Sequence, residues 1–249
     1  MISKNRLKEL AAYRLQKRCD EEAAFVVEGP KMGGEALLAG LGIRAVCALP
    51  RWLEAHGTAC QARGAEVHEV SPADLERLSL MKNPSLVWML LDRPPAAPPP
   101  AAPQGLTLVL DRIQDPGNLG TMLRTADWFG VRHVVCSAGT VDCFNPKVVQ
   151  ASMGAVFRTA VSYTDLAAWL DGVRVPVYGA SLRGLPLDPS RPPAAPAALV
   201  IGNESAGISD EVMRRVTHPL LIPNRGGTAE SLNAAVAAGI LMAWMCLGQ

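Results

Sequence analysis

A proline-rich stretch near the middle of the chain limits what the whole can fold into. Residues 93–104 read RPPAAPPPAAPQ. Proline lacks a backbone N–H and fixes φ, so such a stretch forms neither a helix nor a central strand and favours an extended polyproline conformation. Stretches of this kind act as semi-rigid spacers. We therefore predict one domain over residues 1–92, a linker over 93–104 and a second domain over 105–249.

On the N-terminal side of this linker, short apolar segments alternate with segments of helical periodicity. The strands are expected at residues 25–29, 43–48, 65–70 and 86–91. The helices before and between them are expected at residues 3–16, 30–39, 51–63 and 71–80. Strands that alternate with helices predict a small, mostly parallel α/β domain.

The C-terminal side keeps the same alternation. It begins with an apolar run at residues 106–110, of the kind that is buried on both faces of a parallel sheet. Further strands are expected at residues 133–136, 175–180, 198–201 and 218–223. Helices are expected at residues 119–129, 146–157 and 165–170, and a last helix starts near residues 231–233 and ends at about residue 245. We predict a second α/β domain with a mostly parallel sheet.

The composition excludes several classes of protein. Apolar residues make up 49% of the chain, which is enough for a core without disulfides or metal. The six cysteines are scattered with no C-x-x-C pair, so neither a zinc site nor a disulfide framework is expected. There is no uninterrupted apolar run of about twenty residues and no secretory signal. We expect a soluble, cytoplasmic protein that uses no metal and no membrane.

The charge is balanced overall but not evenly distributed. The formal net charge is +1, which by itself does not indicate a nucleic-acid partner. The first eighteen residues nevertheless carry one acidic residue, Glu9, against the basic residues Lys4, Arg6, Lys8, Arg14, Lys17 and Arg18. This cluster predicts either a surface that binds nucleic acid or a solvated helix face.

Three junctions between a strand and the loop after it combine glycine with polar residues, at residues 115–120, 202–207 and 224–233. Ligands of open α/β sheets bind beyond the carboxyl ends of the strands, so we expect these loops to meet at one site. The chain has no G-x-G-x-x-G, no Walker sequence, no G-x-S-x-G and no H-E-x-x-H. These absences argue against Rossmann, P-loop, serine hydrolase and zinc protease chemistry.

The same loops carry a resemblance to a known family. Residues 111–130, DRIQDPGNLGTMLRTADWFG, closely resemble the first motif of the SpoU/TrmH family of RNA ribose methyltransferases. Residues 199–209, LVIGNESAGIS, resemble its second motif, and residues 222–242, IPNRGGTAESLNAAVAAGILM, its third, in the same order and spacing. The third motif departs from the family at Asn224, where a methionine is common.

The first domain resembles, more weakly, the substrate-binding domain often found ahead of this catalytic domain. The likeness lies in residues 15–31, LQKRCDEEAAFVVEGPK, and in residues 78–84, LSLMKNP. Where the family tends to carry an arginine, this chain has Cys19 with Arg18 beside it. The resemblance therefore leaves an RNA contact at that position open.

The resemblance implies a fold, a cofactor and a reaction. The fold would be a SPOUT α/β knot, in which the C-terminal segment passes through a loop to form a trefoil knot, preceded by a small α/β RNA-binding domain. S-adenosylmethionine would bind in the knot of a homodimer whose active sites draw on both subunits. The reaction would transfer its methyl group to a ribose 2′-hydroxyl of RNA.

Roles for single residues follow from the same resemblance. Arg124 is expected at the 2′-hydroxyl, where it assists deprotonation or, because a guanidinium rarely loses its proton, holds the adjacent phosphate. The alternative is a surface arginine paired with Asp127. Asn118 would orient Arg124 or the ribose, and Glu204 would hold that arginine or a neighbouring backbone amide. The residues expected to hold the cofactor are Ala180, Ser181, Gly202, Asn203, Ile222, Asn224, Ser231 and Leu232.

The sequence leaves alternatives for the role of Ser231 and Asn233 and for the substrate. Ser231 and Asn233 are either hydrogen-bonding partners of the reacting ribose or plain caps of the last helix. The front domain makes ribosomal RNA the expected substrate, since the transfer-RNA enzyme of the family usually lacks such a domain. The alternatives are a transfer-RNA methyltransferase, a catalytically silent RNA-binding or ribosome-assembly protein on the same fold, and a small-molecule methyltransferase.

Overall fold

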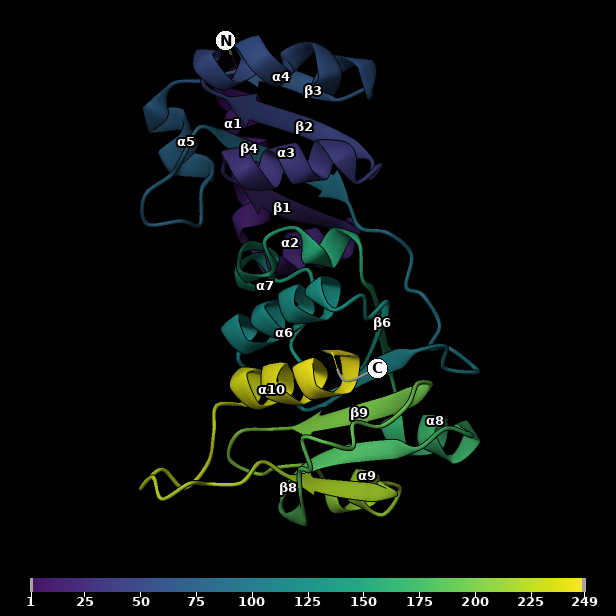
Figure 1. The fold of residues 1–249 in the computed structure, drawn as a ribbon. Coiled ribbons are helices and arrows are strands. Elements are labelled where there is room, and N and C mark those ends of the chain that lie inside the picture. Colours follow the sequence, from purple (N-terminus) through teal and green to yellow (C-terminus); the bar gives the residue numbers. More distant parts are fainter. Residues whose placement is uncertain (1, 248–249) are drawn as a thin grey trace. The chain divides into compact units, whose positions relative to one another are not determined.

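The computed structural model describes residues 2–247. Met1, Gly248 and Gln249, at the outer ends of the two predicted domains, lie outside the described residues. The chain forms two compact units, each with its own sheet (Figure 1). The first unit contains residues 1–95 and 144–157, and the second contains residues 96–143 and 158–249.

The first unit is built on a sheet of mixed direction. Its strands, in spatial order, are β1 (Ala24–Glu28), β4 (Val87–Asp92), β2 (Ile43–Ala48) and β3 (Glu66–Glu69). Strands β2 and β3 are parallel, but β4 runs antiparallel to both of its neighbours. The prediction of mostly parallel pairing is therefore wrong for this unit. The apolar segment 87–91 takes the slot between β1 and β2, where all five of its residues are buried.

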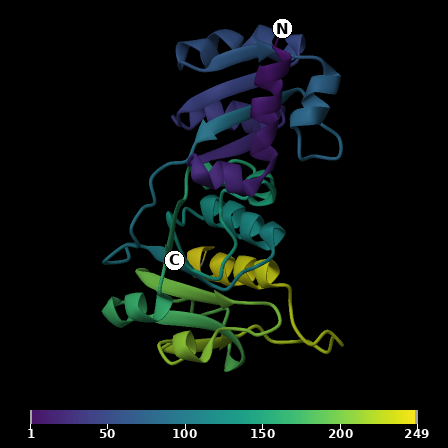
Figure 2. The ribbon, with the colours of Figure 1, turned by 180° about the vertical axis from the view of Figure 1, so that it is seen from behind.

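Helices cover both faces of this sheet. They are α1 (Lys4–Ala11), α2 (Gln16–Glu21), α3 (Pro30–Leu38), α4 (Pro50–Ala62) and α5 (Pro72–Leu78). Figures 1 and 2 show α3 and α1 on opposite faces. Side chains of α1 and α5 share one core with Val26, Cys47 and Trp88 of the sheet. The single helix expected over residues 3–16 is interrupted, because residues 12–14 form a 3₁₀ turn and Leu15 is extended.

A segment that comes later in the sequence also belongs to the first unit. The predicted helix over residues 146–157 ends early, as α7 (Pro146–Ser152), because Met153 and Gly154 adopt positive φ of 52° and 93°. A 3₁₀ turn at Ala155–Phe157 follows. The rings of Phe144 and Phe157 pack against Phe25 of β1, with centroids 4.8 and 6.1 Å away. Aromatic packing thus places residues 144–157 with the first unit, although their place in the sequence is inside the predicted second domain.

The second unit is built on a six-stranded sheet in which every pairing is parallel. Its strands, in spatial order, are β10 (His218–Leu221), β8 (Val177–Pro186), β9 (Ala197–Gly202), β5 (Leu106–Asp111), β6 (His133–Ser137) and β7 (Ala160–Thr164). The parallel α/β architecture is confirmed. Edge strand β7 was not predicted, because its short mixed sequence AVSYT follows a segment that reads as helical.

Four helices complete this unit, namely α6 (Pro116–Trp128), α8 (Leu166–Gly172), α9 (Asp210–Met213) and α10 (Ala234–Leu247). Side chains of α8 and α9 share a core with Val109 and Val200 on one face of the sheet. Helices α6 and α10 lie side by side, and α10 packs against β9 (Figures 1 and 2). Helix α6 begins three residues earlier than predicted because Asp115, rather than a later residue, is its N-cap.

Candidate active site

The polar loops of the second unit meet along one edge of its sheet. Because β10, β8, β9 and β5 are parallel neighbours, their carboxyl ends lie next to one another, and Asp111 is the register partner of Gly202. The segments 112–115, 203–209 and 222–233 all begin at this edge. It is therefore the edge at which an open α/β sheet binds its ligands.

Three polar side chains at this edge are joined by hydrogen bonds, namely Asn118 in the first turn of α6, Glu204 in segment 203–209 and Asn233 at the end of segment 222–233. Asn118 Nδ2 donates to Glu204 Oε1 at 2.9 Å, and Asn233 Nδ2 donates to Asn118 Oδ1 at 2.9 Å. Asn233 Nδ2 also makes a short contact with Glu204 Oε1. The structure thus brings together residues that are up to 115 positions apart in the sequence. We call Asn118, Glu204 and Asn233 the polar triad.

Glu204 fixes how the two amides of the triad are turned. A carboxylate only accepts hydrogen bonds, so both amides must present their N–H groups to it. Its Oε1 also accepts a bond from the backbone N–H of Ala234 at 3.2 Å. Of the two roles expected for Glu204, holding Arg124 or holding a backbone amide, the structure shows the second.

Of the two roles expected for Asn233, the structure shows the helix cap. Its Oδ1 accepts bonds from the N–H groups of Ala235 and Val236, at 3.0 and 3.2 Å, and so caps α10. Its Nδ2 belongs to the polar triad. Ser231, by contrast, is exposed, and within residues 2–247 it has no hydrogen-bond partner.

Arg124 lies on α6, six residues after Asn118, with its side chain exposed to solvent. The alternative expectation, a pair with Asp127, is not what the structure shows. Asp127 is bound instead by Arg158, whose Nη2 and Nε lie 2.8 and 3.1 Å from Asp127 Oδ2. Within the described part of the chain Arg124 has neither a hydrogen-bond nor an ion-pair partner, so its guanidinium is available to a ligand.

Residues after β9 shape the loop that carries Glu204. A Cβ atom at Gly202 would overlap the backbone of Gly207 and Ile208, so only glycine lets the loop fold back at this point. Asn203 Oδ1 accepts bonds from the N–H groups of Ser205 and Ala206, at 3.0 and 3.2 Å. Gly202 and Asn203 therefore hold the loop in place, whether or not they also touch a cofactor.

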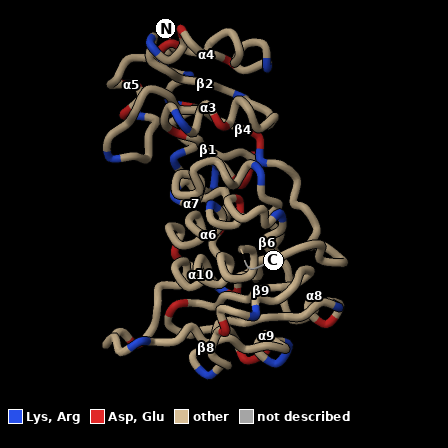
Figure 3. Tube along the Cα trace, in the orientation of Figure 1, with Lys and Arg blue, Asp and Glu red and all other residues tan. Residues whose placement is uncertain are grey.

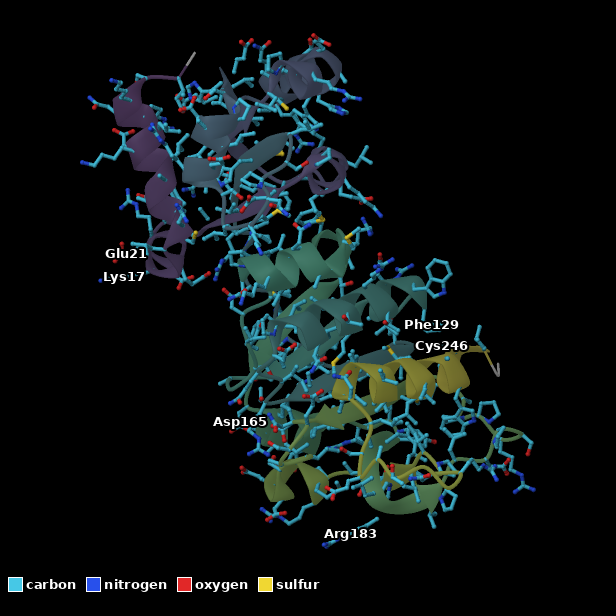
Figure 4. The ribbon with its side chains drawn as sticks, turned by 90° about the vertical axis from the view of Figure 1, so that its left-hand side faces the viewer. Lys17, Glu21, Phe129, Asp165, Arg183 and Cys246 are labelled. Carbon is cyan, nitrogen blue, oxygen red and sulfur yellow. The ribbon has the colours of Figure 1, made fainter. Side chains whose placement is uncertain are left out.

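Ala180 and Ser181 lie in an irregular part of β8. The register between β8 and β10 passes from Gly179 opposite Pro219 to Leu185 opposite Leu220, so the intervening residues of β8 bulge out of the ladder. Ser181 Oγ accepts a bond from Arg183 N–H at 3.2 Å, and the Arg183 side chain points away from the unit (Figure 4). The bulge stands next to the end of β10, where Ile222 follows.

The long loop 222–233 is organised by its own side chains. Asn224 Oδ1 accepts bonds from Gly226 N–H and Gly227 N–H at 2.9 and 2.8 Å, and Asn224 Nδ2 donates to Gly227 O at 3.0 Å. Figure 1 shows this loop reaching away from the sheet. Leu232 is 45% exposed. Three residues expected at the cofactor, Asn224, Ser231 and Leu232, thus lie on an open loop and make no hydrogen bond to the polar triad.

Two residues of the site were not singled out from the sequence. Asp111, 2% exposed, accepts a bond on Oδ2 from Ser209 N–H at 2.7 Å, which ties the end of the Glu204 loop to β5. Arg112, next to it, has a positive φ of 57°. An acidic residue at the end of an apolar strand is the one signal that could have drawn attention to this pair.

No helix among residues 2–247 is both long and apolar enough to cross a membrane. Over the same residues there is no group of histidine, cysteine, aspartate or glutamate side chains arranged to hold a metal ion. The six cysteines are free thiols, and five of them are buried.

Comparison with known proteins identifies two family matches. Residues 105–243 match the SpoU rRNA Methylase family. Residues 4–88 match the MRM3-like substrate binding domain. The two matches lie on either side of the proline-rich linker.

Curated relatives include two enzymes named as methyltransferases of 23S rRNA. The chain is 42% identical over 139 residues to the 23S rRNA (guanosine(2553)-2′-O)-methyltransferase RlmP of Bacillus subtilis; the match covers 54% of this chain and 55% of that enzyme. It is 32% identical to the 23S rRNA (guanosine-2′-O-)-methyltransferase RlmB of Coxiella burnetii, over 71% of this chain and 69% of that enzyme.

Solved structures resemble the chain over nearly its whole length. A protein from Porphyromonas gingivalis assigned to the TrmH family of RNA methyltransferases has a TM-score of 0.88 and 41% identity, with 100% of each chain covered. An rRNA methyltransferase from Sinorhizobium meliloti, solved with AdoMet bound, has a TM-score of 0.86 and 30% identity, with 98% of this chain and 95% of that chain covered.

Proposed function

The chain belongs to the SpoU rRNA methylase family, and from this we propose that it transfers a methyl group from S-adenosylmethionine to a ribose 2′-hydroxyl of RNA. The two curated relatives are named as 23S rRNA methyltransferases, so ribosomal RNA is the proposed substrate class. The observation that carries the proposal is the polar triad, which sits at the ligand-binding edge of the sheet. A bacterial ribosomal RNA substrate would place the protein in the cytoplasm.

The edge of the sheet offers surface that suits the proposed cofactor. S-adenosylmethionine supplies an electrophilic methyl group on a sulfonium, together with an adenine ring and an amino-acid tail. Two large apolar side chains of β8 are exposed, Leu182 (68%) and Leu185 (72%), and Leu232 (45%) is exposed on loop 222–233. Apolar side chains of this kind can contact an adenine ring or a methionine chain. We propose that Leu232, Ile222 and the bulge at Ala180 and Ser181 hold the adenine and the methionine chain.

The proposed role of the polar triad is to position the ribose, not to transfer a proton. A ribose 2′-hydroxyl is a weak acid and a poor nucleophile, so the site must align it with the methyl group, and alignment alone can contribute several kcal/mol. Glu204 locks the amides of Asn118 and Asn233 in one orientation. A fixed amide can hold the ribose in one position without rearrangement during the reaction.

Arg124 is the proposed contact to the RNA at the reacting nucleotide. Its exposed guanidinium has no partner among residues 2–247, and a free arginine suits the bidentate recognition of a phosphate. Because arginine stays protonated in proteins, we assign it to the phosphate and to alignment. Removal of the 2′-hydroxyl proton then falls to an RNA phosphate oxygen or to water.

We also propose that the protein is a homodimer. Two adjacent helices, α6 and α10, expose large apolar side chains, namely Trp128 (84%), Val236 (51%), Ile240 (39%) and Leu247 (75%). Figure 4 shows Phe129 and Cys246 near the ends of these two helices. Val236 and Ile240 lie in the first two turns of α10, which follows Asn233 of the polar triad, so a second copy covering them would also close one side of the site.

A trefoil knot in the C-terminal segment is likewise a proposal. The chain leaves the edge strand β10, passes along loop 222–233 and returns to pack α10 against the inner strand β9 and beside α6. A return of this kind to the middle of the sheet supports threading of the last segment through an earlier loop, which is rare outside families that share it.

The first unit is proposed to bind the RNA beyond the target nucleotide. Part of its basic N-terminal cluster is neutralised, since Arg6 pairs with Glu9 and Glu66, and Arg18 with Glu22. Figure 3 shows acidic and basic positions interspersed over the first unit. The exposed Lys4 and Lys8 remain for RNA phosphates. Cys19 is 2% exposed, so this position contributes to the core and not to an RNA contact.

The proposal is tested by cofactor binding and by one pair of variants. Calorimetry should detect binding of S-adenosylmethionine, and no binding at millimolar cofactor would contradict the enzymatic reading. Arg124→Ala should lower methyl transfer by orders of magnitude and leave cofactor affinity nearly unchanged, while Arg124→Lys should retain part of the activity. Loss of cofactor binding in Arg124→Ala would instead indicate a structural arginine. A protein that binds both RNA and cofactor but never transfers the methyl group would support the silent RNA-binding alternative.

A further inference from the structure

Arg112 occupies a backbone conformation that arginine adopts at a cost. It follows β5 directly, and its φ is 57°, in the left-handed region. A Cβ atom is unfavourable there, and glycine or asparagine would adopt this conformation more readily. An arginine held in such a conformation at the ligand-binding edge of a sheet therefore indicates that its side chain has a function there.

The surrounding structure holds Arg112 in place through its backbone. Its N–H donates to Ser137 Oγ at 2.8 Å, and its carbonyl accepts a bond from Asn203 Nδ2 at 3.0 Å. Both partners lie at the same edge of the sheet, on β6 and after β9. Since neither bond depends on the side chain of residue 112, the fold would accept a smaller residue.

The side chain of Arg112 is also held, but only at its inner end. Nε is buried and lies 3.4 Å from Asp111 Oδ1, and the aliphatic stem packs against Gly139. The side chain as a whole is still 41% exposed, whereas that of Asp111 is 3% exposed. The terminal amino groups of the guanidinium are therefore the part that a ligand can reach. Fixing the inner end lowers the entropy lost when the outer end binds.

We infer that Arg112 is a binding residue for an RNA backbone phosphate beside the target nucleotide. The inference rests on the proposed RNA substrate and adds a second phosphate contact to the one proposed for Arg124. A planar guanidinium with two free amino groups recognises a phosphodiester in a bidentate manner. The Arg112 carbonyl is hydrogen-bonded to Asn203, the residue before Glu204 of the polar triad, so a phosphate bound by Arg112 would fix the register of the RNA strand beside the triad.

The test compares variants at this position for RNA affinity, cofactor affinity and stability. Arg112→Asn removes the charge and tolerates a left-handed backbone, and Arg112→Lys keeps the charge without the planar fork. The probe is a fluorescein-labelled single-stranded RNA of mixed sequence, which suffices because phosphate contacts are independent of sequence. Arg174→Asn is the matched control, because Arg174 is an exposed arginine before β8, at the opposite edge of the same sheet.

For Arg112→Asn we expect the dissociation constant for RNA to rise about tenfold. A plot of the logarithm of the association constant against the logarithm of the salt concentration should become less steep, by about one unit of slope. Arg112→Lys should keep the slope and recover part of the affinity. Cofactor affinity should stay within about twofold, and the unfolding midpoint within about 4 °C, since relief of the backbone conformation offsets loss of the ion pair. The control should match the wild type.

Three results would overturn the inference. They are unchanged RNA affinity in Arg112→Asn, an equal loss in Arg174→Asn, and a loss of cofactor affinity, which would assign Arg112 to the carboxylate of the methionine chain instead. Methyl transfer by the wild type is measured in parallel. A wild type that binds RNA but transfers no methyl group would contradict the proposed function, while the comparison of RNA affinities would still decide the role of Arg112.

Discussion

Replacing Glu204 tests whether the polar triad works as a positioning device. Three donors converge on one oxygen of this carboxylate: Asn118 Nδ2, Asn233 Nδ2 and Ala234 N–H. Glu204→Gln keeps the shape and one acceptor oxygen but removes the charge. A hydrogen bond to a charged group contributes about 1 kcal/mol more than a neutral one. Because Glu204 is exposed, solvent screening reduces the total for three bonds to about 1–2 kcal/mol.

This free energy converts into a rate if the triad holds the reacting ribose. A loss of about 1–2 kcal/mol in the transition state corresponds to a fall in kcat of roughly 5- to 30-fold. Glu204→Ala removes the acceptor altogether and frees both amides to turn, so we expect about 3 kcal/mol, or roughly 100-fold. Water can satisfy the freed donors at this exposed position, so global stability should change little.

The assay is transfer of a tritiated methyl group to RNA, with kcat and KM measured separately for each substrate. Glu230→Gln is the matched control, since Glu230 is an exposed acid of loop 222–233 with no hydrogen-bond partner among the described residues. The control should behave like the wild type. Wild-type kcat in Glu204→Ala, or an effect confined to the KM for S-adenosylmethionine, would refute a positioning role.

Three further predictions concern dimer assembly, the reactivity of the cysteine thiols and the stability of the fold. Ile240→Asp should shift the protein from dimer to monomer in sedimentation velocity and lower activity, because it places a charge on the exposed apolar face of α10; a dimer that persists would place the interface elsewhere. Cys246 should be the first thiol to react with a disulfide reagent at pH 8, because the other five cysteines are buried and burial raises the pKa of Cys47 to about 12; prompt reaction of several thiols in the native protein would contradict this. The Arg6 guanidinium lowers the pKa of Glu66 below its usual 4.5, so the pair stabilises the fold above that pH and the contribution disappears as the pH falls through the lowered pKa. Arg6→Ala should therefore reduce the free energy of unfolding by less than about 1 kcal/mol at pH 7 and by a smaller amount at pH 2 in urea titrations, and an equal loss at both pH values would count against the ion pair.

Much of the second unit could be predicted because its signals are local. Apolar runs such as residues 106–110 belong to strands buried on both faces, and glycine-rich polar loops after them belong to the carboxyl edge of a parallel sheet. The convergence of three loops on one edge follows from parallel pairing alone. The structure adds that Asn118, Glu204 and Asn233 touch, which depends on contacts across 86 and 115 residues that no local pattern contains.

The features that were missed depend on tertiary contacts. Strand order in the first unit is set by where β4 finds the most burial, and the alternation of strands and helices does not carry that information. Residues 144–157 belong to the first unit, where Phe144 and Phe157 pack on Phe25. Asp127 lies on the same helix as Arg124 but forms its ion pair with Arg158, which is 31 residues away in the sequence. In each case a distant residue outcompetes a local preference.

The chemical position of the transferred methyl group shows whether the protein methylates the ribose 2′-hydroxyl. RNA is incubated with the full-length protein and S-adenosylmethionine labelled in its methyl group, and is then hydrolysed in alkali. Alkali cleaves RNA through attack by each 2′-oxygen on the neighbouring phosphate, so a methylated 2′-oxygen protects one linkage. We predict that the label appears in an alkali-stable dinucleotide, and that Arg124→Ala nearly abolishes it. Label recovered in mononucleotides would mean that a base is methylated, and it would contradict the assignment of this site to the ribose 2′-hydroxyl.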